Sequence, residues 1–187
     1  MESSEKYLAD FLSSIGIDLR RLGMDKTPER VTKMYKFLFS GLDREITSAD
    51  WGDLFSSESH GLVAVKHLPF YSMCEHHLVP FFGEVNIVYQ PRMGKVAGFS
   101  KFTKVVEILS HRPQLQERLT CQIAEAVENG LNAEGVLVTV EATQLCMMMR
   151  GDLAPAAKTI TSESRGIFRH DSIMYQQAWQ LLSEDIA

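Results

Sequence analysis

A short stretch that carries one thiol and two imidazoles, Tyr71–Pro80 (YSMCEHHLVP), most constrains what this chain can fold into. Cys74 and His77 have two residues between them, and this spacing lets both side chains reach one metal ion from a tight turn or a strand end. Alone, such a pair also fits a buried thiol and a hydrogen-bonded histidine. If the fold brings Cys146 to the pair, two thiolates and one imidazole make a zinc site whose fourth position is open to water. Such a site is more typical of catalysis than of structural support.

The neighbouring imidazole predicts a second role at the same place. His76 directly precedes His77, and neighbouring residues on a strand point to opposite faces, so the two rings are expected to do different jobs. If His77 binds the metal, His76 is placed to act as general acid or base beside the activated water. Cys121 lies among apolar residues of a predicted helix and is interpreted as a core or surface thiol.

Composition narrows the class of protein. With 187 residues, of which 45% are hydrophobic, the chain can bury a substantial core. A net charge of −5 gives no reason to expect binding to nucleic acid or to acidic membranes. The three cysteines form no regular framework, no apolar signal segment precedes them, and no apolar run has the length of a membrane span. We therefore expect a cytoplasmic protein.

The spacing of apolar residues predicts an α+β fold with an antiparallel sheet. The polar segment 45–60 is predicted to be a loop. In chain order, the predicted elements are helices at 7–15 and 27–38, strands at 61–71, 81–89 and 95–98, helices at 100–109 and 115–131, a strand at 136–142 that 143–150 could continue, an extended segment at 158–168 and a helix at 172–182.

Two lysines and a serine mark a candidate anion site. Ser100, Lys101 and Lys104 stand at a predicted helix start, where free backbone N–H groups and the positive end of the helix dipole favour an anion. This cluster could hold a phosphate chain, with Arg150 adding a bidentate donor. A solvated helix face fits the same spacing.

The start of the following helix carries a candidate for base recognition. Glu117, which follows Gln116, could accept two parallel hydrogen bonds from a guanine edge, because guanine offers N1–H and N2–H₂ donors. A carboxylate in the first turn of a helix also interacts favourably with the helix dipole, and this reading needs no ligand.

These residues, in this order, resemble the type I GTP cyclohydrolases. The segments that carry the resemblance are TPERV from Thr27, CEHHLVPFFG from Cys74, GFSK from Gly98, RPQLQERLT from Arg112 and CMMMRG from Cys146. The resemblance implies the T-fold, an antiparallel sheet with two packed helices. It further implies a division into an N-terminal helical region and loop (1–60) and a catalytic domain (61–187). It also implies a homo-oligomer, a toroidal decamer, with active sites at the subunit interfaces.

The resemblance implies a reaction and a set of roles. The reaction is the conversion of GTP to 7,8-dihydroneopterin triphosphate with release of formate, the first step toward folates and related pterins. The implied roles are zinc ligands, one ion per subunit, for Cys74, His77 and Cys146; catalysis for His76; contacts to the ribose and triphosphate for Ser100, Lys101, Lys104 and Arg150; and guanine recognition for Gln116 and Glu117.

Two positions depart from the pattern of the family. Gln144 stands where the family usually has a second catalytic histidine, and Lys104 where arginine is common. Glutamine can orient a water but cannot exchange a proton near neutral pH, and losing a positioned acid–base group typically removes about 10² to 10⁴ in rate. Besides the full reaction, two hypotheses therefore stay open. The first is ring opening that stops at a formamidopyrimidine nucleotide or diverts to another product. The second is an inactive paralogue that binds a purine nucleotide or regulates an active relative.

Overall fold

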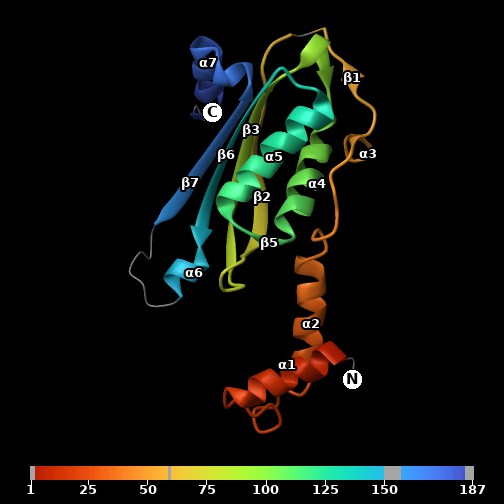
Figure 1. Cartoon of the computed structure of the whole chain (residues 1–187), viewed down its shortest axis with the longest axis vertical. Helices are drawn as coiled ribbons and strands as arrows, with labels where there is room; N and C mark the ends of the chain where they lie inside the picture. Colours follow the sequence, from red (N-terminus) through yellow and green to blue (C-terminus); the bar gives the residue numbers. More distant parts are fainter. Residues whose placement is uncertain (1–2, 59, 150–156, 184–187) are drawn as a thin grey trace. The chain divides into compact units, whose positions relative to one another are not determined.

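The computed structural model describes residues 3–58, 60–149 and 157–183, which form two compact units, Met1–Ser40 and Gly41–Ala187 (Figure 1). The first unit contains helices α1 (Ser3–Ser14) and α2 (Thr27–Leu38). The described residues between 41 and 60 belong to the sheet-bearing unit, whereas the sequence grouped them with the N-terminal helices. The reason is that Trp51 is 1% exposed and belongs to the main core.

The second unit is built on a five-stranded sheet of order β5-β2-β3-β6-β7. All neighbouring strands are antiparallel except β5, which pairs in parallel with the end of β2. The strands are β2 (Val63–Cys74), β3 (Pro80–Gln90), β5 (Pro113–Gln114), β6 (Gly135–Gln144) and β7 (Lys158–Gly166). A separate two-stranded ribbon joins β1 (Phe55–Ser56) to β4 (Lys95–Val96).

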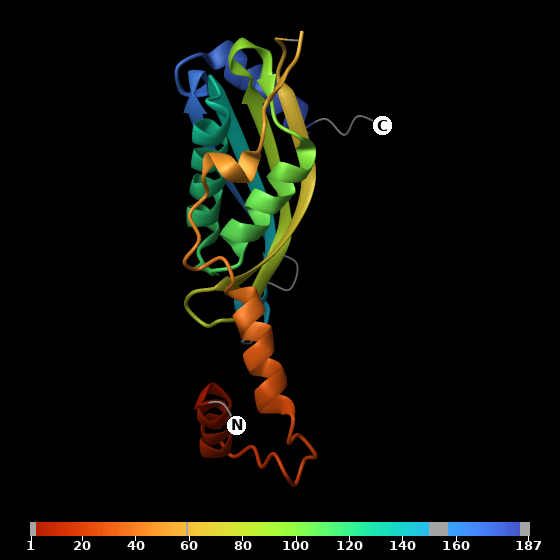
Figure 2. The ribbon, with the colours of Figure 1, turned by 90° about the vertical axis from the view of Figure 1, so that its right-hand side faces the viewer.

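Two long helices, α4 (Phe99–Ser110) and α5 (Gln116–Leu131), cover one face of this sheet (Figures 1 and 2). Val85, Ile87 and Tyr89 of β3 point into the core beneath them and are fully buried. On the other face, α7 (Ser172–Ser183) packs over Val88 at one end of the sheet. The predicted α+β class, with two helices packed on an antiparallel sheet, is confirmed.

Short elements account for the differences from the sequence prediction. The predicted loop 45–60 contains helix α3 (Ser48–Trp51) and strand β1. Helix α4 begins at Phe99 with Gly98 as its N-cap, so Ser100 lies in the first turn and is not the cap. Strand β6 stops at Gln144, where the short helix α6 (Leu145–Met148) begins. The two remaining elements are the 3₁₀ turns η1 (Arg92–Gly94) and η2 (Ile167–Arg169).

Within the three described ranges, no helix combines the length and the hydropathy needed to cross a bilayer.

Trp51 attaches segment 41–60 to the core, and its ring meets that of Phe102 edge-on with centroids 5.1 Å apart. We expect Trp51→Ala to lower the free energy of unfolding by about 3–5 kcal/mol, because the lost burial and the cavity left behind add together. Urea unfolding followed by circular dichroism measures this loss. Phe55→Ala is the matched control, since Phe55 is 60% exposed in the same segment, and it should change stability by no more than about 0.5 kcal/mol. Equal losses in the two variants would contradict the structure.

Candidate metal centre and active site

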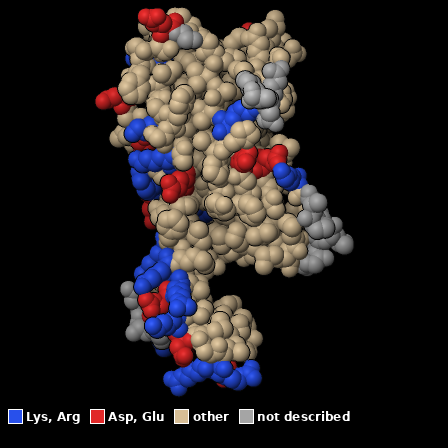
Figure 3. Space-filling view, turned by 180° about the vertical axis from the view of Figure 1, so that it is seen from behind, with Lys and Arg blue, Asp and Glu red and all other residues tan. Residues whose placement is uncertain are grey.

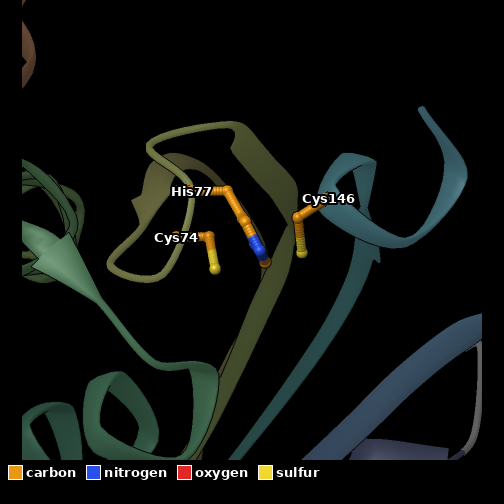
Figure 4. Close-up of side chains that lie close together, drawn as sticks. All are labelled: Cys74, His77 and Cys146. Atoms are coloured by element: carbon orange, nitrogen blue, oxygen red, sulfur yellow. The ribbon is translucent and has the colours of Figure 1, made fainter. Parts of the chain in front are cut away.

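Three potential metal ligands meet at one end of the sheet (Figure 4). Cys74 is the last residue of β2, His77 lies in the turn that follows, and Cys146 lies in α6. The two Sγ atoms and a ring nitrogen of His77 all lie within 4.8 Å of one another. In a tetrahedral zinc site with bonds of about 2.0–2.3 Å, the ligand atoms are about 3.5–3.8 Å apart. The donor types and their spacing therefore fit a zinc ion after only small side-chain adjustments.

The register of the sheet brings these distant residues together. Met73 pairs with Pro80 at the β2–β3 turn, and the next residue of β3, Phe81, pairs with Gln144. The end of β6, and with it Cys146 at the start of α6, is therefore held beside the β2–β3 turn. The turn itself is closed by the backbone, because the N–H of Cys74 donates to the carbonyl of Val79 at 3.0 Å.

An ion pair fastens the β2–β3 turn to helix α5. The two terminal nitrogens of Arg118 lie 2.6 and 3.2 Å from the two carboxylate oxygens of Glu75. This bidentate hydrogen bond from the guanidinium lowers the pKa of the Glu75 carboxyl. Neither residue stood out in the sequence. The pair nevertheless fixes Glu75, which lies between Cys74 and the two histidines, against helix α5.

His76 is exposed and lies in the turn, not on a strand, so the expected alternation of the two imidazoles across a strand does not apply. Its Nδ1 atom is 3.6 Å from Cys74 Sγ, and its ring centroid is 6.1 Å from that of His77. A thiolate can only accept a hydrogen bond, so a metal-bound Cys74 would favour the tautomer with the proton on Nδ1. That tautomer leaves Nε2 as a base.

Gln116, predicted to read guanine, is buried beneath the first turn of α5 with 4% of its surface exposed. Its Nε2 donates to the carbonyl oxygens of Val140 and Thr159, at 2.9 and 3.0 Å. Its Oε1 accepts from Gln144 Nε2 at 2.7 Å and from Thr159 Oγ1 at 2.5 Å. Both donor hydrogens and both acceptor positions of this carboxamide are therefore occupied, which leaves no group for a guanine.

Glu117 has the exposure that Gln116 lacks. Its side chain projects from the first turn of α5. Gln114, two residues before the start of α5, pairs with Cys74 in the β2–β5 ladder. The start of α5 therefore lies next to the candidate metal centre. A guanine near this centre could reach the Glu117 carboxylate.

The three predicted anion-binding residues at the start of α4 lie away from the metal centre of their own chain. Helix α4 ends at Ser110, just before β5 reaches the end of β2, and its twelve residues span about 18 Å. Its first turns, with Ser100 and Lys101, therefore lie toward the other end of the sheet (Figure 1). Arg150, the fourth predicted contact, lies outside the described residues.

Lys104 is already engaged by a carboxylate. Its Nζ is 3.2 Å from Oδ1 of Asp50, which Arg44 also contacts at 2.9 Å. The Asp50 side chain is only 6% exposed, so two cations neutralise one buried charge. To bind a phosphate, Lys104 would have to contact both the phosphate and Asp50.

A three-ligand thiol and imidazole cluster with an exposed histidine beside it, on an antiparallel sheet with helices on one face, has the donor set of a metal-dependent hydrolase. The GTP cyclohydrolase I family model matches residues 4–183. A protein named GTP cyclohydrolase 1 from Streptococcus agalactiae serotype V is 45% identical over 98% of this chain and 97% of its own length. One from Thermoanaerobacter pseudethanolicus is 44% identical over 97% and 96%.

The chain belongs to the GTP cyclohydrolase I family, and the predicted enzyme class and T-fold are confirmed with it. Among solved structures, it is similar to a QueF-like archaeosine synthase in the apo form, with a TM-score of 0.49 and 26% identity, over 58% of this chain and 97% of the other.

Proposed function

We propose that this chain converts GTP to 7,8-dihydroneopterin triphosphate with release of formate, and that it binds one zinc ion per subunit. The observation that carries the proposal is the cluster of Cys74, His77 and Cys146, whose ligand atoms lie within 4.8 Å of one another in a chain of this family. Cys74, His77 and Cys146 would hold the zinc ion, which when bound would lower the pKa of a water to about 7 and supply hydroxide at neutral pH. Thiolate ligands must stay reduced, which supports a cytoplasmic location.

His76 has the position for the proton transfers. The oxygen of the attacking water forms a bond to C8 of the guanine while the C8=N7 π bond breaks. Nε2 of His76 takes the proton that this water loses, and N7 gains a proton. The C8–N9 bond then breaks, N9 accepts a proton, and the carbon that was C8 remains as a formamide on the pyrimidine. A second water cleaves the formamide to formate and an amine. Rearrangement of the ribose and ring closure give the pterin.

Recognition of the substrate falls to residues of α5 and α4 and to Arg150. Glu117, exposed beside the metal centre, accepts hydrogen bonds from N1–H and N2–H₂ of the guanine. Ser100, Lys101 and Arg150 bind the triphosphate and ribose, with Lys104 as a shared cation. Because the first turns of α4 lie away from the metal centre of the same chain, the contacts of Ser100, Lys101 and Lys104 come from a neighbouring subunit.

This arrangement requires a homo-oligomer, which we propose to be the decamer of the family. The outer face of the sheet supports assembly, because Tyr71 and Ile160 are each 65% exposed and Phe82 stacks on Tyr71. Figure 3 shows this side of the molecule with broad uncharged areas between a few charged side chains. Surfaces of this kind typically become buried between subunits.

Mixing two inactive variants tests the shared site. Cys146→Ser removes a metal ligand, and Lys101→Ala removes a triphosphate contact; each alone should be inactive. After joint unfolding and reassembly in equal amounts, about one site in four should combine a normal metal centre with a normal α4, so about a quarter of the activity should return. Formate release measures it, with a tag on one variant to verify mixed oligomers. Mixed oligomers without regained activity would place Cys146 and Lys101 in the site of one and the same chain, and would contradict the shared site.

A second candidate function is ring opening that stops at a formamidopyrimidine nucleotide. Gln144 favours it, since its carboxamide stands where the family usually has a histidine and cannot exchange a proton near neutral pH. The hydrolysis of the formamide and the later rearrangement would then lack one acid–base group.

One experiment separates the candidates. Zinc-loaded protein is incubated with GTP, and formate, ring-opened nucleotide and fluorescent pterin are separated and quantified. Equimolar formate and pterin establish the full reaction. Ring-opened nucleotide without formate establishes the second candidate. Binding of GTP with none of the three products would show an inactive paralogue and would overturn both.

A further inference from the structure

A chain of hydrogen bonds runs from strand β7 to the candidate metal centre. Thr159 Oγ1 donates to Gln116 Oε1 at 2.5 Å, and Gln144 Nε2 donates to the same oxygen at 2.7 Å. Gln144 Oε1 lies 3.9 Å from Cys146 Sγ, at the other end of its carboxamide. We call Thr159, Gln116 and Gln144 the amide relay.

Two backbone carbonyls fix the direction of the amide relay. The carbonyl oxygens of Val140 and Thr159 can only accept, so the group of Gln116 that faces them must be its NH₂. The oxygen of Gln116 therefore faces Gln144. An oxygen can only accept as well, so Gln144 must turn its NH₂ toward Gln116 and its own oxygen toward Cys146. The orientation of both amides follows from the sheet and not from a choice between nitrogen and oxygen at each amide.

The orientation of Gln144 determines which hydrogen-bonding group it presents to the reaction. Gln144 Oε1 has two acceptor positions, and Cys146 Sγ, 3.9 Å away, can occupy only one of them. The side-chain oxygen then faces the centre as a hydrogen-bond acceptor. A water is the donor that fits there, because it has two hydrogens and no fixed direction.

We propose that Gln144 is a positioning residue that orients the attacking water through Oε1, and that Gln116 and Thr159 hold it in this direction. This inference rests on the proposed hydrolytic function. It assigns Gln116 to the placement of Gln144 and not to guanine recognition, and it brings Thr159 into the site. It also explains how the chain can retain water attack at C8 without a second imidazole: Gln144 only has to orient the water, and His76 can take the proton of the water and return a proton to N7.

Thr159→Val tests the relay, because valine keeps the shape of threonine and removes the donor to Gln116. We expect kcat for loss of GTP to fall by about 10-fold from poorer positioning, with KM for GTP within about 2-fold, since Thr159 is not assigned a contact with substrate. Thr159→Ser restores the hydroxyl and should regain most of the rate. Thr161→Val is the matched control: it lies two residues along the same strand and loses its own hydrogen bond, to Thr120 at 2.6 Å. It should leave kcat within about 2-fold.

A structural readout does not depend on activity. Gln116→Met removes the whole amide on which Gln144 rests, and crystal structures of the zinc-free wild type and of this variant show the Gln144 side chain directly. We expect the bond from Gln144 Nε2 to Gln116 in the wild type, and a rotated or multiply placed Gln144 in the variant. If Gln116→Met does not fold, the zinc-free Thr159→Val structure gives the same readout, as a Gln144 side chain with a second conformer.

The outcomes separate this inference from the proposed function. A wild type that loses GTP, together with Thr159→Val at full kcat, overturns the inference and leaves the function intact. Equal losses in Thr159→Val and Thr161→Val also overturn it, because the effect would then be general loosening of strand β7. A wild type that does not act on GTP overturns the proposed function, and the crystal structures still decide whether the amide relay exists.

Discussion

Formate release from GTP is expected to fall by more than about 10²-fold when Cys146 is replaced with serine, and the zinc content of the purified protein should fall with it. Cys146 supplies one of three ligand atoms that lie within 4.8 Å of one another. A serine hydroxyl keeps its proton at neutral pH and is a poor zinc ligand, whereas a cysteine thiol ionises on binding. Loss of an outer-shell partner alone typically costs about 10–100-fold in affinity or activity, so loss of a ligand should cost more. Metal analysis and a formate assay measure the two effects.

The third cysteine provides the control for this substitution. Cys121 is half-buried in helix α5, and burial raises the pKa of its thiol, so it is a weaker nucleophile and ligand than an exposed thiol. Cys121→Ser makes the same chemical change away from the centre and should keep one zinc per chain and a rate within about 2-fold of the wild type. A Cys146→Ser protein with full zinc and full turnover would show that the ion does not use this thiol.

Much of the sheet unit could be predicted because its elements bury one face each. The alternation in β3 places Val85, Ile87 and Tyr89 in the core, and the helical spacing in α4 does the same for Phe102 and Val106, all at most 1% exposed. A one-residue shift of register would turn these side chains to solvent, so the pattern and the structure are tightly coupled. Where burial is one-sided, the sequence alone predicts the element.

Features that depend on contacts between distant segments could not be predicted. Strand β2 shifts its register between Val65 and Leu68, and His67 there adopts a φ of 57°. Asn86, far along the chain, accepts the backbone N–H of His67 at 2.8 Å and supports this conformation. Trp51 is similar, because a polar segment around one aromatic residue gives no periodic signal. The burial of Trp51 depends on Gly130, a distant residue whose missing side chain lets the indole pack against the backbone of α5.

In the candidate site, too, some residues could be predicted from the sequence and others could not. The spacing of Cys74 and His77, together with the family resemblance, indicated the candidate ligands because only a few types of side chain, thiols and imidazoles among them, bind zinc. The roles of polar residues depended on their surroundings. Gln116 was expected to face substrate but is buried with its carboxamide fully bonded, and Lys104 was expected to face a phosphate but contacts Asp50. Glutamine and lysine serve many purposes, so their partners, and not their identity, define what they do.

Gln144→His is expected to raise the rate of pterin formation by about 10²- to 10⁴-fold if the missing acid–base group limits the reaction. The amide relay can accommodate the change, because an imidazole N–H can donate to Gln116 Oε1 as Gln144 Nε2 does at 2.7 Å. The second ring nitrogen then faces the centre. Imidazole titrates near pH 6.5, so it can give and take a proton where an amide can only orient a water. Fluorescence of the oxidised pterin measures the gain.

Gln144→Asn is the matched control for this substitution, since it keeps an amide that cannot exchange protons and should bring no gain. If the histidine variant accumulates pterin while the wild type accumulates ring-opened nucleotide, a single side chain separates the two candidate products. If Gln144→His and Gln144→Asn bind zinc equally and form pterin at the same rate, the proton-transfer argument is contradicted. Position 144 would then act only through the orientation of water, and a carboxamide held by Gln116 would be sufficient for every step that this enzyme performs.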